Sequence, residues 1–181
     1  TLDYTRRAQN DVVVRSENQL RAIMGNVSRG TRVVIASKIF ITKPVVIRIK
    51  ETFDDQITSQ FVIVTGFGSG RLERKQGLDV GFSMFVVSAQ SQSDPVGLQF
   101  LDLSFVDFQT AIAIEDGDTV LNLRVKGCTT ERCTRFIGPS NFGGEASAVN
   151  ATIEGNTCLG ENWDTAALTA SINYEDSLIL N

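Results

Sequence analysis

The chain has 181 residues, of which 42% are hydrophobic and 21% charged, a balance typical of a folded domain and not of a disordered chain. Its 17 basic and 21 acidic side chains give a formal net charge of −4, which argues against nucleic acid as a partner. No apolar run approaches the roughly 20 residues that cross a bilayer, so we expect no membrane partner.

The charge is unevenly distributed along the chain. Residues 1–75 hold 13 basic and 7 acidic side chains, whereas residues 76–181 hold 4 basic and 14 acidic ones. This asymmetry indicates either a basic end that docks on an acidic partner or a chance bias among solvated strands.

Residues 1–11 are predicted to be an extended polar arm, because they show no periodicity. They include Arg6 and Arg7 but no hydrophobic stretch, so no secretory signal is expected. The chain starts at a small Thr without an initiator Met, which is what trimming would leave in a complete mature protein.

A short amphipathic helix is predicted over Ser16–Val27. Ser16 and Gln19 have the spacing of a capping box. Leu20, Ile23, Met24 and Val27 follow at positions that share one helix face.

Short apolar runs then follow one another to residue 153, and most of the breaks between them contain Gly, Asp, Asn, Pro or Ser. No second helix of any length fits between the runs, so alternating βα units are excluded. A sandwich, a barrel or a solenoid remains. The runs are 31–36, 39–42, 45–49, 61–65, 84–87, 98–105, 111–114, 120–125, 135–137 and 149–153.

Internal repeats favour a parallel β-helix over a sandwich or jelly roll. LDLSFVDF from Leu101, LNLRVKGC from Leu121 and VNATIEGN from Val149 share one pattern, so Leu101, Leu121 and Val149 are predicted to start successive rungs. We expect the alternate apolar residues of these segments to form inward columns, with Asp102, Asn122 and Asn150 as one outward column. The predicted helix would then cap the first rung, since terminal repeats need a polar outer face.

The rung pattern is predicted to stop after Gly160, which divides the chain into an arm (1–11), a capping helix with the β-helix (12–160) and a C-terminal segment (161–181). The last segment is expected to cap the stack or to hold subunits together. Its large apolar side chains are the predicted subunit contacts: Trp163, Leu168, Ile172 and Tyr174.

Three cysteines, Cys128, Cys133 and Cys158, are predicted to be free thiols, because an odd number without a signal peptide argues against a disulfide framework. The chain has no His to complete a zinc site. No metal and no cofactor are therefore expected.

The helix, the strand run TRVVIASKIFITKPVVIRI and the repeated rungs resemble the pectate-lyase-like β-helix superfamily, and within it the tailspike-related proteins of tailed bacteriophages. The resemblance covers roughly residues 12–160 and concerns the rung pattern, not a signature motif. It implies a right-handed β-helix, here with about five or six rungs, and a homotrimer. Some such proteins cut polysaccharide, and shorter ones decorate or cement the capsid.

Enzymatic members of this superfamily with histidine-containing motifs are excluded, because the chain has no His. A tailspike-type glycosidase would need two carboxylates, roughly 5 Å apart for retention or roughly 6.5–9.5 Å for inversion. Asp102 is expected to lie alone in an amide column, and residues 115–118 are predicted to be a solvated turn. The candidate carboxylates are Asp102, Asp107, Glu115, Asp116, Asp118 and Glu131.

The sequence therefore leads to a hypothesis of a non-enzymatic virion protein, without catalytic residues, that decorates the capsid surface and binds itself and the major capsid protein. The N-terminal arm, with Tyr4, Arg6 and Arg7, would dock on the capsid. Two alternatives stay open: a tailspike-like depolymerase, either glycosidase or lyase, and a short receptor-binding fibre.

Overall fold

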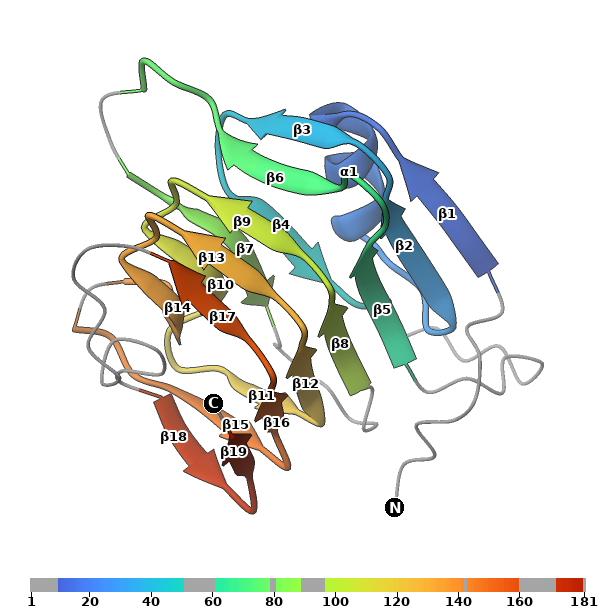
Figure 1. Cartoon of the computed structure of the whole chain (residues 1–181). Helices are drawn as coiled ribbons and strands as arrows, with labels where there is room; N and C mark the ends of the chain where they lie inside the picture. The colour runs from blue at the N-terminus through green and yellow to red at the C-terminus, as the bar shows by residue number, and fades with distance from the viewer. Residues whose placement is uncertain are drawn as a thin grey trace.

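Figure 1 shows the computed structural model, which describes residues 10–50, 61–78, 81–88, 97–141, 143–159 and 172–180. This part of the chain is mostly strand, and its one helix is α1 (Glu17–Met24). All strand pairings within it are parallel. The predicted all-β class with parallel pairing is confirmed.

The described strands form four sheets, which we name A to D. Sheet A contains, in spatial order, β1 (Asn10–Val14), β2 (Thr31–Ile35), β5 (Phe61–Gly66), β8 (Gly97–Leu101), β12 (Leu123–Lys126), β16 (Thr152–Glu154) and β19 (Leu178–Leu180). Sheet B contains β3 (Lys38–Ile41), β6 (Arg71–Arg74), β9 (Ser104–Val106), β13 (Thr129–Glu131) and β17 (Thr157–Leu159). Sheet C contains β4 (Val45–Arg48), β7 (Ser83–Ser88), β10 (Thr110–Ile114) and β14 (Arg135–Pro139). Sheet D contains β11 (Thr119–Leu121), β15 (Ala146–Val149) and β18 (Ile172–Glu175).

The chain visits the sheets in a fixed order, and we call one passage through them a circuit. Strands β8, β9, β10 and β11 follow one another through sheets A to D, and the chain then returns to sheet A at β12. The next circuit, β12 to β15, pairs with the previous one strand by strand. Parallel neighbouring strands need such a long connection, because a tight hairpin can join only antiparallel strands.

The register confirms one predicted alignment and corrects another. Leu121 pairs with Val149, and Val125 pairs with Ile153, as the second and third repeats predict. The predicted alignment of Leu101 with Leu121 is wrong, because Leu101 pairs with Lys126 instead. The same longer offset between these two circuits recurs in sheets B and C.

The core is built from columns of apolar side chains that run along the stack of circuits. In sheet A, Val33, Val64, Phe100, Val125 and Ile153 occupy one register position, and each is fully buried. Burial of one such side chain stabilises the fold by roughly 1.5–3 kcal/mol. The columns of successive circuits therefore supply the main favourable free energy of folding.

Residues with a positive φ make the corners between sheets. Asp102, Gly127 and Gly155 (φ 53°, 65° and 62°) lie at the last three of the corners that lead from sheet A to sheet B. A second set lies where sheet D leads back to sheet A: Asn122, Asn150 and Asp176 (φ 55°, 55° and 49°). This left-handed conformation suits Gly, and Asn and Asp tolerate it better than other side chains do.

The corners correct the predicted outward column of Asp102, Asn122 and Asn150. Asn122 and Asn150 do stack, with the Asn150 Nδ2 donating to Asn122 Oδ1 at 2.6 Å. Asn122, however, is buried and does not face solvent. Asp102 lies at the other corner, where the backbone N–H of Asp102 donates to the Lys126 carbonyl at 2.9 Å, beside Gly127.

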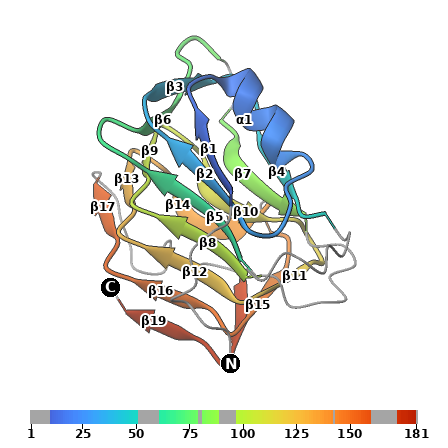
Figure 2. The ribbon, with the colours of Figure 1, turned by 90° about the vertical axis from the view of Figure 1, so that its right-hand side faces the viewer.

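Helix α1 covers the N-terminal end of the core. Ser16 caps it by accepting a hydrogen bond from the Gln19 backbone N–H, as predicted. Leu20 and Met24 are fully buried, and α1 packs against β4 and β3 of the first circuit. Figure 2 shows α1 beside β1 at one end of sheet A, with β19 at the other end. Within the described residues, no helix is long and apolar enough to cross a membrane.

The parallel pairing continues beyond residue 160, which corrects the predicted end of the repeats for the described part of the C-terminal segment. Strand β18 pairs with β15, and β19 pairs with β16, both in parallel. At the other end, β1 starts at Asn10, so the last two residues of the predicted arm belong to sheet A.

Candidate functional site

A connected group of charged side chains lies on sheet B and includes two of the candidate carboxylates. Asp107 follows β9 at a left-handed corner. The Asp107 carboxylate accepts hydrogen bonds from Arg132 Nε at 2.6 Å, from a terminal nitrogen of Arg132 at 3.0 Å and from Gln76 Nε2 at 3.2 Å. The hydrogen bond from Arg132 is the main reason why the pKa of Asp107 lies below its ordinary value. Asp107 is therefore held as a carboxylate.

The second carboxylate of this group, Glu131, lies between two arginines. Glu131 forms an ion pair with Arg132 and a second one, at 3.2 Å, with Arg71. Arg71 also lies 3.3 Å from Glu73, which is 2.7 Å from Lys38 Nζ. This network links β3, β6 and β13, so it ties three circuits together. Its carboxylates are occupied by cations, which is the arrangement of a stabilising surface network rather than of an acid–base pair.

The predicted turn at residues 115–118 is confirmed, because Gly117 has a φ of 81° between β10 and β11. Asp116 accepts hydrogen bonds from the side-chain and backbone nitrogens of Asn141, at 2.6 and 3.2 Å, and from Ser140 Oγ at 3.2 Å. These bonds, first of all the one from the Asn141 side chain, lower the pKa of Asp116. Asp116 thus fastens one circuit to the next.

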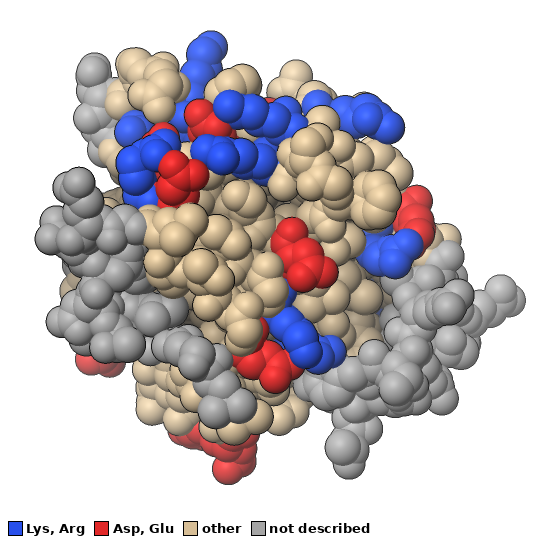
Figure 3. Space-filling view, in the orientation of Figure 1, with Lys and Arg blue, Asp and Glu red and all other residues tan. Residues whose placement is uncertain are grey.

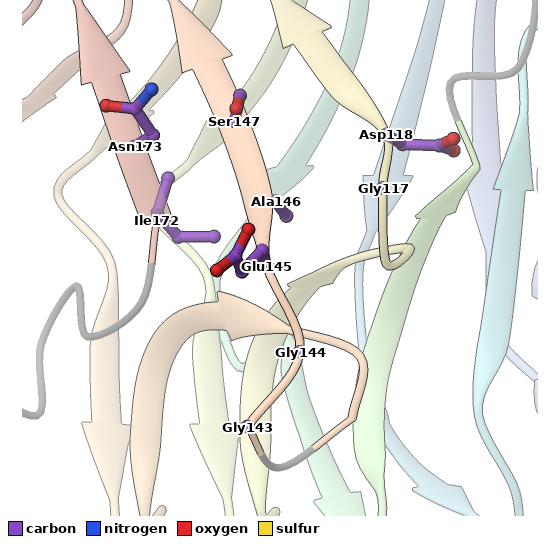
Figure 4. Close-up of a pocket in the computed structure, with 9 residues that line it drawn as sticks. All are labelled: Gly117, Asp118, Gly143, Gly144, Glu145, Ala146, Ser147, Ile172 and Asn173. Atoms are coloured by element: carbon purple, nitrogen blue, oxygen red, sulfur yellow. The ribbon is translucent and has the colours of Figure 1, made fainter.

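A pocket of about 710 Å³ opens at the end of sheet D, next to this turn. Two carboxylates line this pocket. Asp118 belongs to the turn, and Glu145 is the residue immediately before β15. In Figure 4 the Asp118 side chain points away from Glu145, whose carboxylate turns toward Ile172. The two carboxylates do not converge, so they do not form the pair that glycoside hydrolysis requires. The other lining residues are Gly117, Gly143, Gly144, Ala146, Ser147, Ile172 and Asn173.

Sequence reasoning missed Glu145 and Asn173 as pocket residues. Glu145 and Asn173 are brought together by the pairing of β15 with β18, in which Ser147 is the partner of Asn173. The Gly143–Gly144 pair was a usable signal, because a Cβ on Gly144 would lie 2.3 Å from the Asp116 carboxylate. A glycine that other atoms approach so closely marks a tight crossing of two circuits.

The three cysteines are free, as predicted. Burial raises the pKa of Cys128 to about 12 and that of Cys133 to about 11. Burial also raises the pKa of the half-buried Cys158. All three are therefore neutral thiols at neutral pH, which makes them poor nucleophiles.

In the described part of the chain, no three His, Cys, Asp or Glu side chains are grouped closely enough to hold a metal ion. The glycine-rich segment 66–70 leads directly into β6 and not into a helix. It therefore lacks the helix N-terminus that binds phosphate in such loops.

The C-terminal end of the stack exposes apolar side chains. Leu159, Leu178 and Ile179 are 50%, 51% and 38% exposed. Two of the predicted subunit contacts, Ile172 and Tyr174, are in β18 and pack partly against the core. Burial raises the pKa of Tyr174, and its hydroxyl has no hydrogen-bond partner among the described residues.

The other predicted site residues lie outside the described residues. They are the arm residues Tyr4, Arg6 and Arg7 and the predicted contacts Trp163 and Leu168. Nothing in the structure bears on their roles.

Comparisons with family models, with curated proteins and with solved structures gave no match.

Proposed function

We propose that this protein is a non-enzymatic structural protein of a virus particle, which decorates the capsid of a tailed phage and binds the major capsid protein as a homotrimer. The observation that supports the non-enzymatic part is the state of the candidate carboxylates. Asp107, Asp116 and Glu131 are bound to neighbouring side chains, and Asp118 points away from Glu145.

The proposal includes a right-handed parallel β-helix of about five or six rungs, with α1 as its cap. The circuits support it, because each one lies on the previous one with parallel pairing. A stack of this kind is a rigid spacer with little concave surface, which suits a protein that binds other subunits better than one that encloses a substrate.

Two segments are assigned to assembly in this proposal. The arm with Tyr4, Arg6 and Arg7 docks on the capsid. The C-terminal segment with Trp163, Leu168, Ile172 and Tyr174 holds three chains together. Ile172 and Tyr174 lie on β18, in sheet D, and are only partly buried, which supports the second assignment, because aromatic and aliphatic anchors concentrate at subunit interfaces.

The test is the position and copy number of the protein in purified particles, measured by gold labelling and quantitative mass spectrometry. Hundreds of copies over the shell are expected, whereas a few copies at the tail would contradict the proposal in favour of a spike or fibre. Removing residues 1–9, which leaves β1 complete, should abolish binding to particles but leave the trimer intact by light scattering. Asp107→Asn is the matched control and should still bind particles.

A tailspike-like depolymerase remains the second candidate, and the pocket beside sheet D favours it. Asp118 and Glu145 reach this pocket, and a rearrangement on sugar binding would be needed to bring their carboxylates together. Polysaccharide cleavage that Glu145→Gln removes, but Glu115→Gln does not, would establish this function and overturn the first.

A further inference from the structure

Charge changes sign along the stack of circuits. Residues 10–50, which form β1, α1 and the first circuit, contain eight basic and two acidic side chains. After Arg135 the sequence contains six acidic residues and no Lys or Arg. Figure 3 shows the same trend, with basic side chains gathered over β3 and β6 and acidic ones near the turn between β18 and β19. The molecule thus has a basic end and an acidic end.

The acidic end has the properties of an interface. Strand β19 is the last strand of sheet A, so among the described residues one of its edges has no strand partner. Ile179 continues the buried column of Val125 and Ile153 but is 38% exposed, and Leu178 beside it is 51% exposed. An apolar edge strand of this kind is a ready template for another strand, because no described strand pairs with its backbone groups on that side.

The acidic charge at this end selects the partner. Glu175 and Asp176 stand exposed immediately before β19, and no basic residue of the last circuit can offset them. Two acidic ends that meet face to face would place these carboxylates close together, and such like-charge contacts are destabilising. The edge of β19 therefore favours a basic surface that also offers a strand edge.

The basic end of the same chain meets both requirements. Strand β1 is the first strand of sheet A, and Val13 within it is 50% exposed. This end also carries exposed cations. Arg15 directly follows β1, and the backbone N–H of Lys50 donates to the carbonyl of Val27, three residues after α1, at 2.8 Å. Both β1 and β19 run parallel to their neighbours, so β19 of one copy can extend sheet A of the next in the same sense.

We propose that the protein associates head to tail, with the acidic end of one copy, at β19, binding the basic end of a second copy, at β1. The interface is heterologous, so it leaves one free end of each kind and allows further copies to add. This proposal rests on the stack and its charges and does not depend on a role in a virus particle.

The test uses charge reversal at each end of the full chain, with size-exclusion chromatography and light scattering over a concentration series. The acidic-end variant is Glu175→Lys with Asp176→Asn, which keeps a residue that tolerates the φ of 49° at position 176. The basic-end variant is Arg15→Glu with Lys50→Glu. Each variant alone should associate at least about tenfold more weakly than the wild type, because like charges then meet. A mixture of the two should recover association, because each reversed end again meets its opposite.

A single Glu115→Lys change in the third circuit is the control, because it alters the net charge away from both ends and should leave association unchanged. Association of the wild type should weaken as salt rises from about 0.05 to 0.5 M, because salt screens these contacts. A wild type that shows no concentration-dependent association overturns the proposal. A basic-end variant that associates normally also overturns it, and would indicate contact between two acidic ends. Failure of the mixture to recover would likewise reject the head-to-tail arrangement.

Discussion

The two ends of the stack solve the same physical problem in different ways. At the N-terminal end, β1 and α1 cover the first circuit, and the side chains that face it, Leu20 and Met24, are fully buried. At the C-terminal end, Ile179 lies over the buried Ile153 but remains 38% exposed. The core of a parallel stack runs along one axis and is open at both ends of that axis. Each end must therefore be covered by a cap or left as a surface for another molecule. The capped end thus contributes Leu20 and Met24 to the core, whereas the open end leaves Ile179 partly exposed for the proposed association.

A Leu→Asp substitution at each end should give the largest difference in the free energy of unfolding between the two ends. Leu20→Asp places an unpaired charge in the capped end and should destabilise the fold by about 4 kcal/mol or more, or abolish soluble expression. Leu178→Asp adds a charge where the side chain is half exposed, and should change the free energy of unfolding by about 0.5 kcal/mol or less. Urea unfolding followed by circular dichroism measures both. Equal losses at the two positions would show that the ends do not differ.

Substitution of two corner glycines tests whether packing is tighter in the interior of the stack than in its last circuit. A Cβ on Gly127 would lie 2.2 Å from Asp102 Oδ1, whereas a Cβ on Gly155 has no atom within 4 Å. Both residues have a positive φ, so Gly155→Ala should cost roughly 1–2 kcal/mol for the backbone alone. Gly127→Ala should cost at least about 1 kcal/mol more, because the Asp102 side chain must move. Chemical denaturation of both variants gives the difference, and a larger loss for Gly155→Ala would contradict the predicted packing.

The cap itself is tested by its first residue. Ser16→Ala removes the hydroxyl that accepts the Gln19 backbone N–H, and should destabilise α1 by about 1 kcal/mol. Hydrogen exchange should speed up for the amides of α1 and change little for those of β18. Ser16→Thr keeps the hydroxyl and should retain most of the protection.

The smallest expected effect is the pH dependence of the cap. Burial raises the pKa of Glu17, but hydrogen bonds from Arg21 and Thr42 outweigh it, and the net pKa lies below the ordinary value of 4.5. A lowered pKa in the folded state means that the stabilisation is present above the unfolded pKa and is lost as the pH falls through the folded one. The urea midpoint should therefore drop less steeply below about pH 4.5 in Glu17→Gln than in the wild type. Parallel slopes would show that Glu17 does not stabilise the cap.

The sequence was sufficient for the all-β class with parallel pairing and for one alignment, because apolar residues alternate in Leu121–Val125 and in Val149–Ile153 and these segments do pair. The predicted alignment of Leu101 with Leu121 failed for a local reason. An Asp or Asn between two apolar residues indicates a left-handed corner, but it does not indicate which two sheets that corner joins. Asp102 turns from sheet A to sheet B, whereas Asn122 turns from sheet D to sheet A. The circuits β8 to β11 and β12 to β15 each have several left-handed corners, so the local pattern alone leaves the register open.

The candidate site was less predictable than the fold. The ion pair between Arg71 and Glu131 joins residues that are 60 positions apart, and Glu145 reaches the pocket through the turn beside Gly143 and Gly144. Such contacts depend on the length of each circuit, and this length varies. In sheet C, β4 and β7 are joined by a much longer stretch of chain than β10 and β14 are. The length of a connection cannot be read from the alternation of the strands that it joins.

The stacked corners at Asn122 and Asn150 indicate which deletions and duplications the chain should tolerate. These residues occupy equivalent positions in successive circuits, so deletion of residues 123–150 would join Asn122 to Ala151 and remove one whole turn of the winding. Duplication of the same segment would add one. Either change should yield a cooperatively folding chain of altered length, whereas removing half of this segment should not. Thermal unfolding of the three variants would show whether the protein tolerates growth and loss in whole units.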